Sequence, residues 1–570
     1  MNKKWSRRTL SWVQLSLFTM VLVLLNILSN AFFTQFDLTE EKRFTLTKPT
    51  KELLHSIDDV AYVRILLEGE FPAGFKRLQR ATQELLQDFR SYSPWIEFEF
   101  EDPNEGSVAQ RNKRRKELSE LGINPTTLRL KDAEGTEEKL IYPWAIVYYK
   151  GREAYVNLLE QQGMQNPHVV LNNSIALLEY KFANAISKLM KGTKPYIAFT
   201  VGHGELNNLE RKDLVNHLGQ YYNVGTFVLD SAAYIPEEVA VLIVARPTSP
   251  FSEKDKFKID QYVMRGGKVI WLIDRLNAAL DSLRGRDAFV PLDYPLNLED
   301  LLFKYGIRIE PNLLLDLQCG LIPQVVGMQG GQPQIDMFKW YYFPVVTPDL
   351  AHPITKGLDG IYLEFPSTID TTVRIKTPVT RTVLLHSSPY SRVQYSPVRL
   401  NFDILHYEPD PEKFSKGPYP VAMLLEGEFP SLYEHRVTEK MLAGLEKIGK
   451  PFKARSEYTR MLVVSDGDIA RNPVNLDGTI MPLGYNRFMR YQFANRDFLL
   501  NAIEYLQDPD GVIAARAKDV KLRLLDTVRT QEEKLKWQLI NLVLPLAFLI
   551  LFGVVWNWWR RRKYAIRQPV

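Results

Sequence analysis

Cysteine is almost absent from this sequence: its 570 residues include one, Cys319. No intrachain disulfide can form, and zinc or iron–sulfur sites built from several cysteines are excluded. Common catalytic and nucleotide-binding motifs are missing as well, among them Gly-x-Ser-x-Gly, His-Glu-x-x-His, Gly-x-Gly-x-x-Gly and the Walker A loop. Without a Walker A loop the chain cannot hydrolyse nucleotide by the P-loop route, so any ATPase that powers its work must be another subunit.

An excess of charge of one sign is also missing from most of the chain. The net charge is +5, and the hydrophobic content of 45% is too high for a disordered protein. Nine basic residues stand in the segments 3–8 and 560–567, so the region between them carries −4. Because binding of a polyanion needs a basic surface, we do not expect nucleic acid as a partner. The length suits roughly three to four domains of about 150 residues each.

Two long stretches, 10–36 and 537–559, contain no charged residue. Each is long enough to cross the membrane as a helix, which takes about 20 apolar residues. Basic residues precede the first stretch and follow the second, so the positive-inside rule places 1–9 and 560–570 in the cytoplasm and the rest outside. The alternative for the first stretch is a cleaved signal peptide, since Ser29-Asn-Ala31 resembles a cleavage site. The length of the apolar run favours an uncleaved anchor.

The first soluble region, 37–165, has the pattern of a small α/β domain. Strand, helix, strand, helix and hairpin are predicted in this order at 61–67, 74–92, 95–100, 108–121 and 145–158. This order is typical of a thioredoxin-like fold. Thioredoxins carry Cys-x-x-Cys just after the first strand, but residues 68–72 contain no cysteine, so we expect a scaffold without dithiol exchange.

The second soluble region, 166–510, alternates between apolar strands and helices. Strands are predicted at 194–201, 222–229, 239–245, 268–274 and 460–465, with helices at 172–190, 208–221, 253–265 and 495–506. This alternation predicts a doubly wound α/β sheet with right-handed crossovers. Helical periodicity fades at about 313–425, where we expect a β-rich insertion, and 511–536 is expected to form a juxtamembrane helix.

Three of the predicted strands end in polar loops. These loops hold five candidate ligand-contact residues, namely His203, Glu205, Asp274, Asp466 and Asp468. Because ligands of doubly wound sheets bind at the carboxyl ends of the strands, these side chains should converge if all belong to one sheet. A histidine with several carboxylates can bind a cation or polarise a water molecule. Aspartate at a strand end more often caps a helix or holds a turn, so we assign no catalytic residue, metal or cofactor.

Several motifs together resemble the gliding-type auxiliary proteins of ABC transporters. They are Asp37-Leu-Thr followed by Phe44-Thr-Leu-Thr, Phe199-Thr-Val-Gly-His-Gly-Glu205, Val241-Leu-Ile-Val-Ala-Arg-Pro247, Gly266-Gly-Lys-Val-Ile-Trp-Leu-Ile-Asp274, Leu462-Val-Val-Ser-Asp-Gly-Asp468 and Asn495-Arg-Asp-Phe-Leu-Leu-Asn501. Each motif alone is weak, but their order and spacing are specific. The resemblance runs almost from end to end and includes both membrane segments.

The resemblance implies a non-enzymatic subunit of the bacterial inner membrane, acting with a separate permease and a separate ATPase. It also implies a periplasmic fold shared with intraflagellar-transport proteins and similar to glutamine-amidotransferase-like (flavodoxin-like) domains. The amidotransferase nucleophile is a cysteine at a strand–helix elbow, and no such cysteine occurs here, so that activity is not carried over. Membrane lipid and periplasmic envelope or motility proteins are the further partners implied.

Two other functions stay open from the sequence. One is a membrane-anchored periplasmic enzyme or ligand-binding protein that uses the region of His203, Glu205 and Asp274. The other is an interaction scaffold that needs no transporter. Loss of function in His203→Ala with folding intact would favour the first, and activity without any permease would favour the second.

Overall fold

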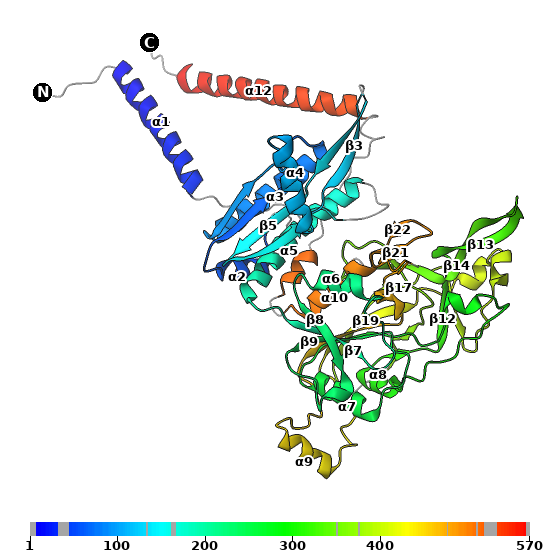
Figure 1. Ribbon diagram of the computed structural model, residues 1–570. Helices are drawn as coiled ribbons and strands as arrows, with labels where there is room; N and C mark the ends of the chain where they lie inside the picture. Colours follow the sequence, from blue (N-terminus) through cyan, green and yellow to red (C-terminus); the bar gives the residue numbers. More distant parts are fainter. Residues whose placement is uncertain are drawn as a thin grey trace. The chain divides into compact units, whose positions relative to one another are not determined.

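The computed structural model describes residues 7–31, 45–132, 135–160, 167–348, 351–373, 377–475, 477–508, 511–517 and 533–565 (Figure 1). Contacts within the chain divide it into two units, Met1–Asp519 and Val520–Val570. The first unit contains all of the sheets, and the second contains one long helix.

That long helix is α12, Lys534–Ala565, with Pro545 in its interior. Among the described residues it is the one helix long and apolar enough to cross a membrane, as the stretch 537–559 predicted. The other predicted stretch, 10–36, overlaps α1, Arg7–Ala31, and its residues 32–36 lie outside the described residues. The apolar part of α1, Trp12–Leu24, is shorter than a membrane-spanning helix, so this first crossing stays a prediction. Most of the predicted juxtamembrane helix, 518–532, lies outside the described residues.

The first soluble domain is built on a four-stranded sheet in the order β2-β1-β5-β6. The strands are β1 Ala61–Ile65, β2 Ile96–Phe100, β5 Trp144–Tyr149 and β6 Arg152–Asn157; β1 and β2 run parallel, and β5 runs antiparallel to both β1 and β6. Around this sheet are α2 Lys48–His55, α3 Ala73–Tyr92, α4 Val108–Glu120 and the hairpin of β3 Thr126–Asp132 with β4 Gly135–Ile141. The predicted element order is therefore present, and the thioredoxin-like assignment itself stays a prediction.

Helix α5, Pro167–Lys191, belongs with this first domain, although the boundary expected at 165 assigned it to the second. Its residues Leu171, Phe182 and Ile186 lie in one hydrophobic core with strands β1 and β5. The apolar face of α5 covers the sheet, and this packing was hidden from the sequence because it depends on contacts across the domain.

The second domain contains a long mixed sheet whose parallel strands lie in the order β8-β7-β9-β10-β20. They are β7 Tyr196–Val201, β8 Asn223–Val228, β9 Val239–Ala245, β10 Val269–Leu272 and β20 Thr459–Val464. Numbered along the chain, this order is 2-1-3-4-5, the order of flavodoxin-like doubly wound sheets. Its topological switch point lies between β7 and β9.

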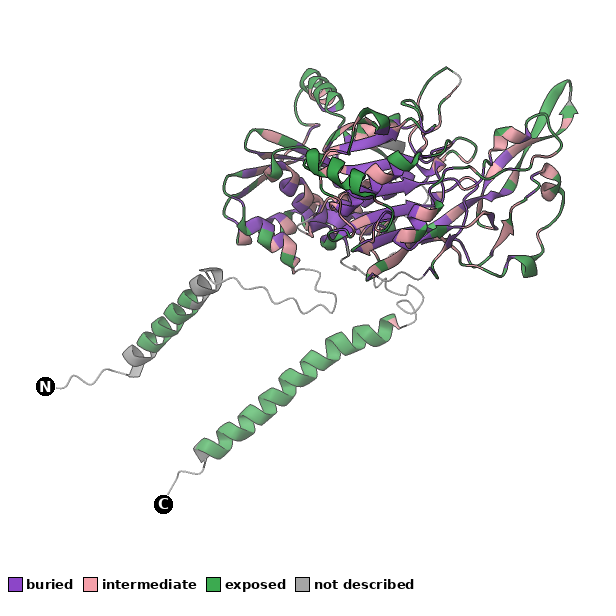
Figure 2. Ribbon diagram, turned by 90° about the horizontal axis from the view of Figure 1, so that it is seen from below, coloured by how far each residue is buried: buried purple, intermediate pink, exposed green. Residues whose placement is uncertain are grey.

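Helices cover both faces of this sheet. On one face lie α6 Lys212–Leu218 and α10 Asn495–Leu506, and on the other lie α7 Glu253–Met264 and α8 Glu299–Tyr305. Successive strand residues point to opposite faces, so Phe199 and Leu272 enter one core while Ala198 and Trp271 enter the other. Because both faces are buried, the strands are almost continuously apolar (Figure 2).

The segment expected as a β-rich insertion is in part a continuation of the same sheet. Strands β17 Val379–His386 and β19 Pro420–Gly427 pair antiparallel to each other, and β19 pairs with β20. The segment is rich in strands, as expected for about 313–425. Its continuation of the main sheet was not predicted, because antiparallel pairing between distant segments leaves no local sequence signal. The hairpin of β13 Cys319–Gln329 and β14 Gln332–Pro348 forms the end of the sheet.

Smaller elements complete the second domain. Short strand pairs are β11 Arg308–Ile309 with β16 Ile369–Asp370, β12 Asn312–Asp316 with β18 Ser391–Tyr395, β15 Ile361–Tyr362 with β14, and β21 Tyr485–Asn486 with β22 Tyr491–Gln492. Helix α9 is Glu439–Lys447. Short 3₁₀ helices are Leu229–Ser231, Leu280–Leu283, Phe402–His406, Pro411–Phe414, Asp468–Ala470 and Val512–Ala517.

Candidate functional site

The carboxyl ends of the parallel strands hold all five candidate residues, as the sequence predicted. His203 and Glu205 follow β7, Asp274 follows β10, and Asp466 and Asp468 follow β20. The structure brings them together as two groups. One, the His203 group, consists of His203, Glu205 and Asp255. The other, the acidic cluster, consists of Asp274, Asp466 and Asp468 with Glu364 and two arginines.

In the His203 group, an imidazole lies between two carboxylates. Its Nδ1 is 3.5 Å from Glu205 Oε1, and its Nε2 is 3.4 Å from Asp255 Oδ2. The ring stacks on Phe251, with centroids 3.8 Å apart and planes inclined by 6°. The backbone N–H of His203 also donates to Glu205 Oε2 at 2.6 Å. Contacts on both edges and on one face of the ring hold the imidazole in a single orientation.

The close contacts in the His203 group shift the pKa values of its members. Burial opposes the charged imidazolium, but Glu205 and Asp255 outweigh it and raise the pKa of His203 above its usual value. Burial likewise opposes the charged carboxylate of Glu205, yet hydrogen bonds to His203 and nearby backbone N–H groups lower its pKa. Each partner therefore stabilises the charged form of the other.

The loop after β7 folds tightly because of its glycines. The N–H groups of Thr248 and Ser249 both donate to the carbonyl oxygen of His203, at 2.8 and 2.9 Å. Gly204 has a φ of +74°, and a Cβ there would lie 2.0 Å from Thr248 Oγ1. A side chain at Gly204 would thus separate this loop from the one after β9, which crosses it at the switch point.

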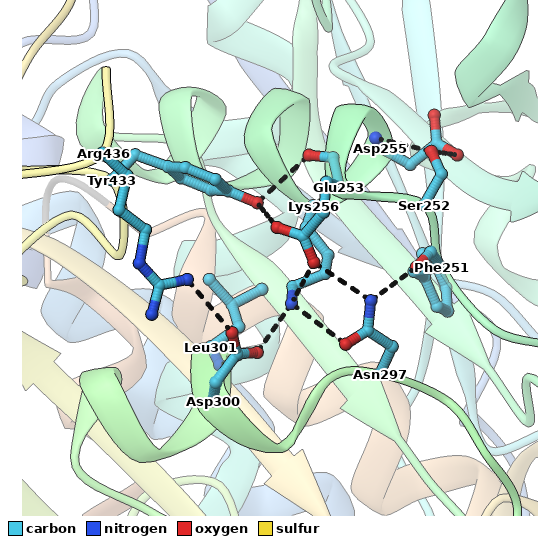
Figure 3. Close-up of polar contacts among 10 residues, drawn as sticks. All are labelled: Phe251, Ser252, Glu253, Asp255, Lys256, Asn297, Asp300, Leu301, Tyr433 and Arg436. Carbon is cyan, nitrogen blue, oxygen red and sulfur yellow. Dashed lines mark hydrogen bonds and ion pairs between the residues drawn. The ribbon is translucent and has the colours of Figure 1, made fainter. Parts of the chain in front are cut away.

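The other partner of His203 is held by a buried polar network at the start of α7 (Figure 3). Ser252 caps the helix, and its hydroxyl donates to Asp255 Oδ2 at 2.7 Å. In the same turn of α7, the fully buried amine of Lys256 lies 2.7 Å from Asp300 Oδ1 and 3.0 Å from Glu253 Oε1. An ammonium buried this deeply requires such partners, so the network fixes the first turn of α7 and with it Asp255.

The acidic cluster gathers three carboxylates whose nearest oxygens lie within 4.8 Å of one another, those of Asp274, Asp466 and Asp468. The guanidinium of Arg246 binds two of them: its Nε is 3.1 Å from Asp274 Oδ2 and 3.2 Å from Asp468 Oδ1. Arg471 lies 2.7 Å from the same oxygen of Asp468. Two cations of the chain therefore already neutralise part of this negative charge.

Backbone N–H groups supply further donors to the acidic cluster. The N–H of Gly467 donates to Asp274 Oδ1 at 2.6 Å, and that of Asp468 donates to Asp466 Oδ1 at 2.7 Å. The N–H of Glu364 donates to Asp466 Oδ2 at 2.7 Å. The aspartates thus hold the turn after β20 and connect it to β10 and to the segment at 364, which is the turn-holding role considered from the sequence.

Crowding of buried acids favours protonation in this cluster. Burial and the neighbouring Asp468 raise the pKa of Asp274 to about 6 and that of Glu364 to about 7. Burial and the adjacent aspartates Asp274 and Asp468 raise the pKa of Asp466 well above its usual range. Near neutral pH the cluster therefore holds protons, and Glu364 changes its charge within the physiological range.

Part of the acidic cluster opens into a cavity of about 580 Å³. Its charged lining includes Arg246, Glu364, Asp468, Arg471 and Arg487, and its aromatic lining comprises Phe343, Tyr362, Tyr485 and Phe488. The three aspartates are the described residues that could hold a metal ion. Arg246 places a permanent positive charge between two of them, so a second cation would have to displace it.

Sequence reasoning missed four side chains that complete these groups: Arg246, Asp255, Glu364 and Arg471. Arg246 directly follows β9, so the strand-end rule that found Asp274 could have found it. Asp255 lies in the first turn of α7 and was interpreted only as a helix residue. Glu364 lies in the irregular segment after β15, where no sequence signal connects it with the strand ends.

Comparison with known proteins places the second domain in a family. The model of the family described as ABC-type uncharacterized transport system matches residues 194–502, which is more than half of the chain. The model of a second family, Domain of unknown function (DUF7088), matches residues 40–148 of the first domain.

Relatives and solved structures are more distant. A protein of Borreliella burgdorferi, described as an uncharacterized protein, is 20% identical over 566 residues, covering 96% of this chain and 97% of its own length. The mmIFT52 N-terminal domain is 12% identical with a TM-score of 0.31, over 57% of this chain and all of that domain. The exo-beta-1,4-mannosidase Op5Man5 from an Opitutaceae bacterium is 10% identical with a TM-score of 0.19, over 82% of this chain and 55% of that one. At these TM-scores neither structure informs the fold or the function.

Proposed function

We propose, from the premise that this chain belongs to the family described as ABC-type uncharacterized transport system, that it is an auxiliary subunit of an ABC transporter. The match of residues 194–502 carries this proposal, since it spans the doubly wound sheet and both polar groups at its strand ends. The permease and the ATPase are separate proteins. The absence of a Walker A loop in this sequence agrees with that division of labour.

The role of the subunit is non-enzymatic. The candidate acids bind protein groups: Arg246 contacts Asp274 and Asp468, and backbone N–H groups donate to Asp466. Such pairing supports a structural role at the strand ends better than a role in catalysis, which needs a reactive group directed at a substrate.

The chain crosses the bacterial inner membrane twice, with both termini in the cytoplasm and the two soluble domains in the periplasm. The length and apolar composition of α12 support the second crossing, and the uncharged run 10–36 supports the first. Basic flanks outside both segments support the orientation. A chain tethered at both ends cannot shuttle, so it couples motion of the permease to envelope or motility proteins.

The finer assignment follows from the sequence motifs. Their order and spacing resemble those of the gliding-motility protein GldG, so we place the subunit in a transporter that serves gliding motility. The first domain, residues 37–165, is a thioredoxin-like scaffold without a dithiol.

Copurification tests this function directly. The full chain, tagged at its C-terminus, is purified in mild detergent from its native membrane, and its partners are identified by mass spectrometry. We expect an ABC permease and an ATPase in amounts comparable to the bait. A two-pass membrane protein of similar abundance with the same tag serves as the control. Recovery of the chain alone, monodisperse and in good yield, would contradict the proposal.

One observation favours a second function, a membrane-anchored ligand-binding protein or enzyme. The cavity beside Glu364 and Asp468 has both acidic and basic groups on its lining, as a site for a small polar ligand needs. The version based on His203, Glu205 and Asp274 needs these three side chains around one ligand, and Asp274 already contacts Arg246 and the N–H of Gly467. Metal analysis and ligand screens on the purified chain and on Asp468→Asn separate this function from the first.

A further inference from the structure

The two soluble domains meet at a cavity of about 550 Å³, which we name the domain-joint cavity. Both domains lie within the unit Met1–Asp519. The first domain contributes the start of β6 and the C-terminal half of α5 to its lining, and the second contributes the residues before β8 and the end of α10 (Figure 1). Ligand pockets often form where two domains meet, so the chemistry of this lining indicates what the cavity can bind.

The carboxylates that line the cavity are already bound by donors of the chain. Glu504 of α10 accepts hydrogen bonds from three side chains on one face of α5, namely Tyr180, Asn184 and Lys188. Glu153 accepts from the hydroxyl group of Tyr155, and Asp508 accepts from the N–H of Ile513 at 2.7 Å. A cation that entered the cavity would therefore compete with donors that these carboxylates already bind.

Two cations of the lining have no carboxylate partner. Arg152, the first residue of β6, makes no hydrogen bond or ion pair with any residue that the structure describes. Its Nη1 lies 3.2 Å from the place where a Cβ at Gly192 would stand, in the segment that joins α5 to β7. Lys194 donates to the carbonyl oxygen of Gly219 at 3.0 Å. Because a free guanidinium presents five N–H donors and a permanent positive charge, this side of the cavity suits an oxyanion.

Hydroxyl groups without partners line the same cavity. Ser187 and Tyr222 are only 5% and 6% exposed, yet neither hydroxyl group makes a hydrogen bond within the described part of the chain. The hydroxyl group of Thr193 also lines the cavity without such a bond. Buried hydroxyl groups are normally hydrogen-bonded, so a ligand with several acceptor oxygens would complete this site.

The positive potential extends beyond the lining of the cavity. Burial, together with the cations Arg460 and Lys191, lowers the pKa of Lys268. Lys191 lines the cavity, and Lys268 makes no ion pair with a described residue. An anion in the domain-joint cavity would therefore reduce the repulsion between neighbouring cations.

We propose that the domain-joint cavity binds a phosphate group, carried by a small phosphate ester or by a phospholipid head group. The oxygens of a phosphate can accept from the guanidinium of Arg152, the ammonium of Lys194 and the hydroxyl groups, whereas a carboxylate has only two oxygens. A group bound there contacts both soluble domains and holds them together. This inference goes beyond the proposed function, because the binding needs no transporter partner.

Isothermal titration calorimetry on the full chain in amphipol tests the binding. Inorganic phosphate and glycerol 1-phosphate are titrated at constant ionic strength, with acetate as the carboxylate control. We expect the phosphate compounds to bind at least about tenfold more tightly than acetate. Arg152→Gln and Lys194→Gln should each weaken this binding at least about fivefold. The matched controls Arg90→Gln and Lys440→Gln change exposed residues outside the cavity and should leave the affinity unchanged.

Thermal unfolding shows whether the variants remain folded. Without phosphate, Arg152→Gln and Lys194→Gln should keep the midpoint of the parent, because neither side chain has an ion pair in the described part of the chain. Saturating phosphate should raise the midpoint of the parent and raise that of Arg152→Gln less.

A soluble phospholipid separates the two sources of the phosphate group. Dihexanoyl phosphatidylglycerol is titrated below its critical micelle concentration. Tighter binding of this lipid than of glycerol 1-phosphate assigns the site to a head group, and the reverse order assigns it to a soluble ester.

Three results would overturn the inference. They are no binding of any phosphate compound, equal affinity for acetate, and binding that Arg152→Gln and Lys194→Gln leave unchanged, which places the anion elsewhere on the chain. None of these results affects the proposed function, which the copurification of permease and ATPase decides independently. Failure of the copurification would likewise leave the titration valid.

Discussion

The His203 group and the acidic cluster lie at the same edge of one sheet, yet they balance charge in different ways. In the first, one imidazole serves two carboxylates and is stacked on Phe251. In the second, Arg246 contacts Asp274 and Asp468, Arg471 contacts Asp468, and the crowded carboxyl groups favour protonation. Position at a strand end therefore brings polar groups together, but the neighbours from other elements decide what each group does.

The largest loss of stability in either group should follow the removal of Arg246. Arg246→Gln leaves Asp274 and Asp468 without their shared guanidinium in a buried site, so we expect a loss of about 3 to 5 kcal/mol in the free energy of unfolding. Denaturant unfolding of the full chain in detergent measures it. Arg471→Gln is the matched control: its side chain is 35% exposed against 19% for Arg246, so about 1 kcal/mol or less is expected. Equal losses for the two variants would contradict this account.

The His203 group should show a smaller effect that depends on pH. His203→Gln removes the stack on Phe251 and both ion pairs, for an expected loss of about 1 to 3 kcal/mol. The raised pKa of His203 means that its contribution is fully present below the usual value of about 6.5 and is lost as pH rises through the folded value. The thermal midpoint should therefore drop more at pH 5.5 than at pH 8.5. Exposed His435 gives the control, since His435→Gln should change little at either pH.

The acidic cluster should lose stability in the same direction as pH rises, but through a carboxyl group instead of an imidazole. Because the pKa of Glu364 is raised to about 7, the folded chain retains a proton that the unfolded chain has lost. Stability from this group is therefore greatest below about pH 4.5 and falls as pH rises to about 7. Glu364→Gln should reduce that fall by about 3 kcal/mol. A pH series of unfolding curves measures the slope, and identical slopes for variant and parent would refute the assignment.

The smallest loss of stability is expected in the exposed hairpin, which contributes to neither charged group. Ile335→Gln should change the free energy of unfolding by no more than about 0.5 kcal/mol, because the side chain is 59% exposed. Circular dichroism during thermal unfolding measures this. A loss comparable to that of His203→Gln would mean that this side chain packs within the chain.

Local patterns predicted much of the sheet. The apolar runs at β7, β9, β10 and β20 were recognised as strands because continuous burial gives an unmistakable sequence signal. The five candidate residues followed from where those strands end. The predicted helix 208–221 is shorter in the structure, Lys212–Leu218, since the residues before it form turns.

The contacts that could not be predicted from the sequence join segments that are far apart in the chain. Strands β17 and β19 join the main sheet through pairing with distant residues, and Glu364 reaches the acidic cluster from a segment without periodicity. Likewise, Asp255 acts as a partner of His203 only because the loop after β9 crosses the loop after β7. These arrangements depend on tertiary packing, which composition and spacing do not encode in a single sequence.

The position of β20 in the sheet has a consequence for how the chain is made. Met461 of β20 pairs with Val269 of β10. The central strand β10 can therefore pair with β20 only after roughly 190 more residues have left the ribosome. Until then β10 presents an open, entirely apolar edge. A nascent chain that stalls before residue 459 therefore exposes an edge onto which other chains can aggregate. Synthesis of this domain must be faster than self-association, or another protein must cover this edge during synthesis.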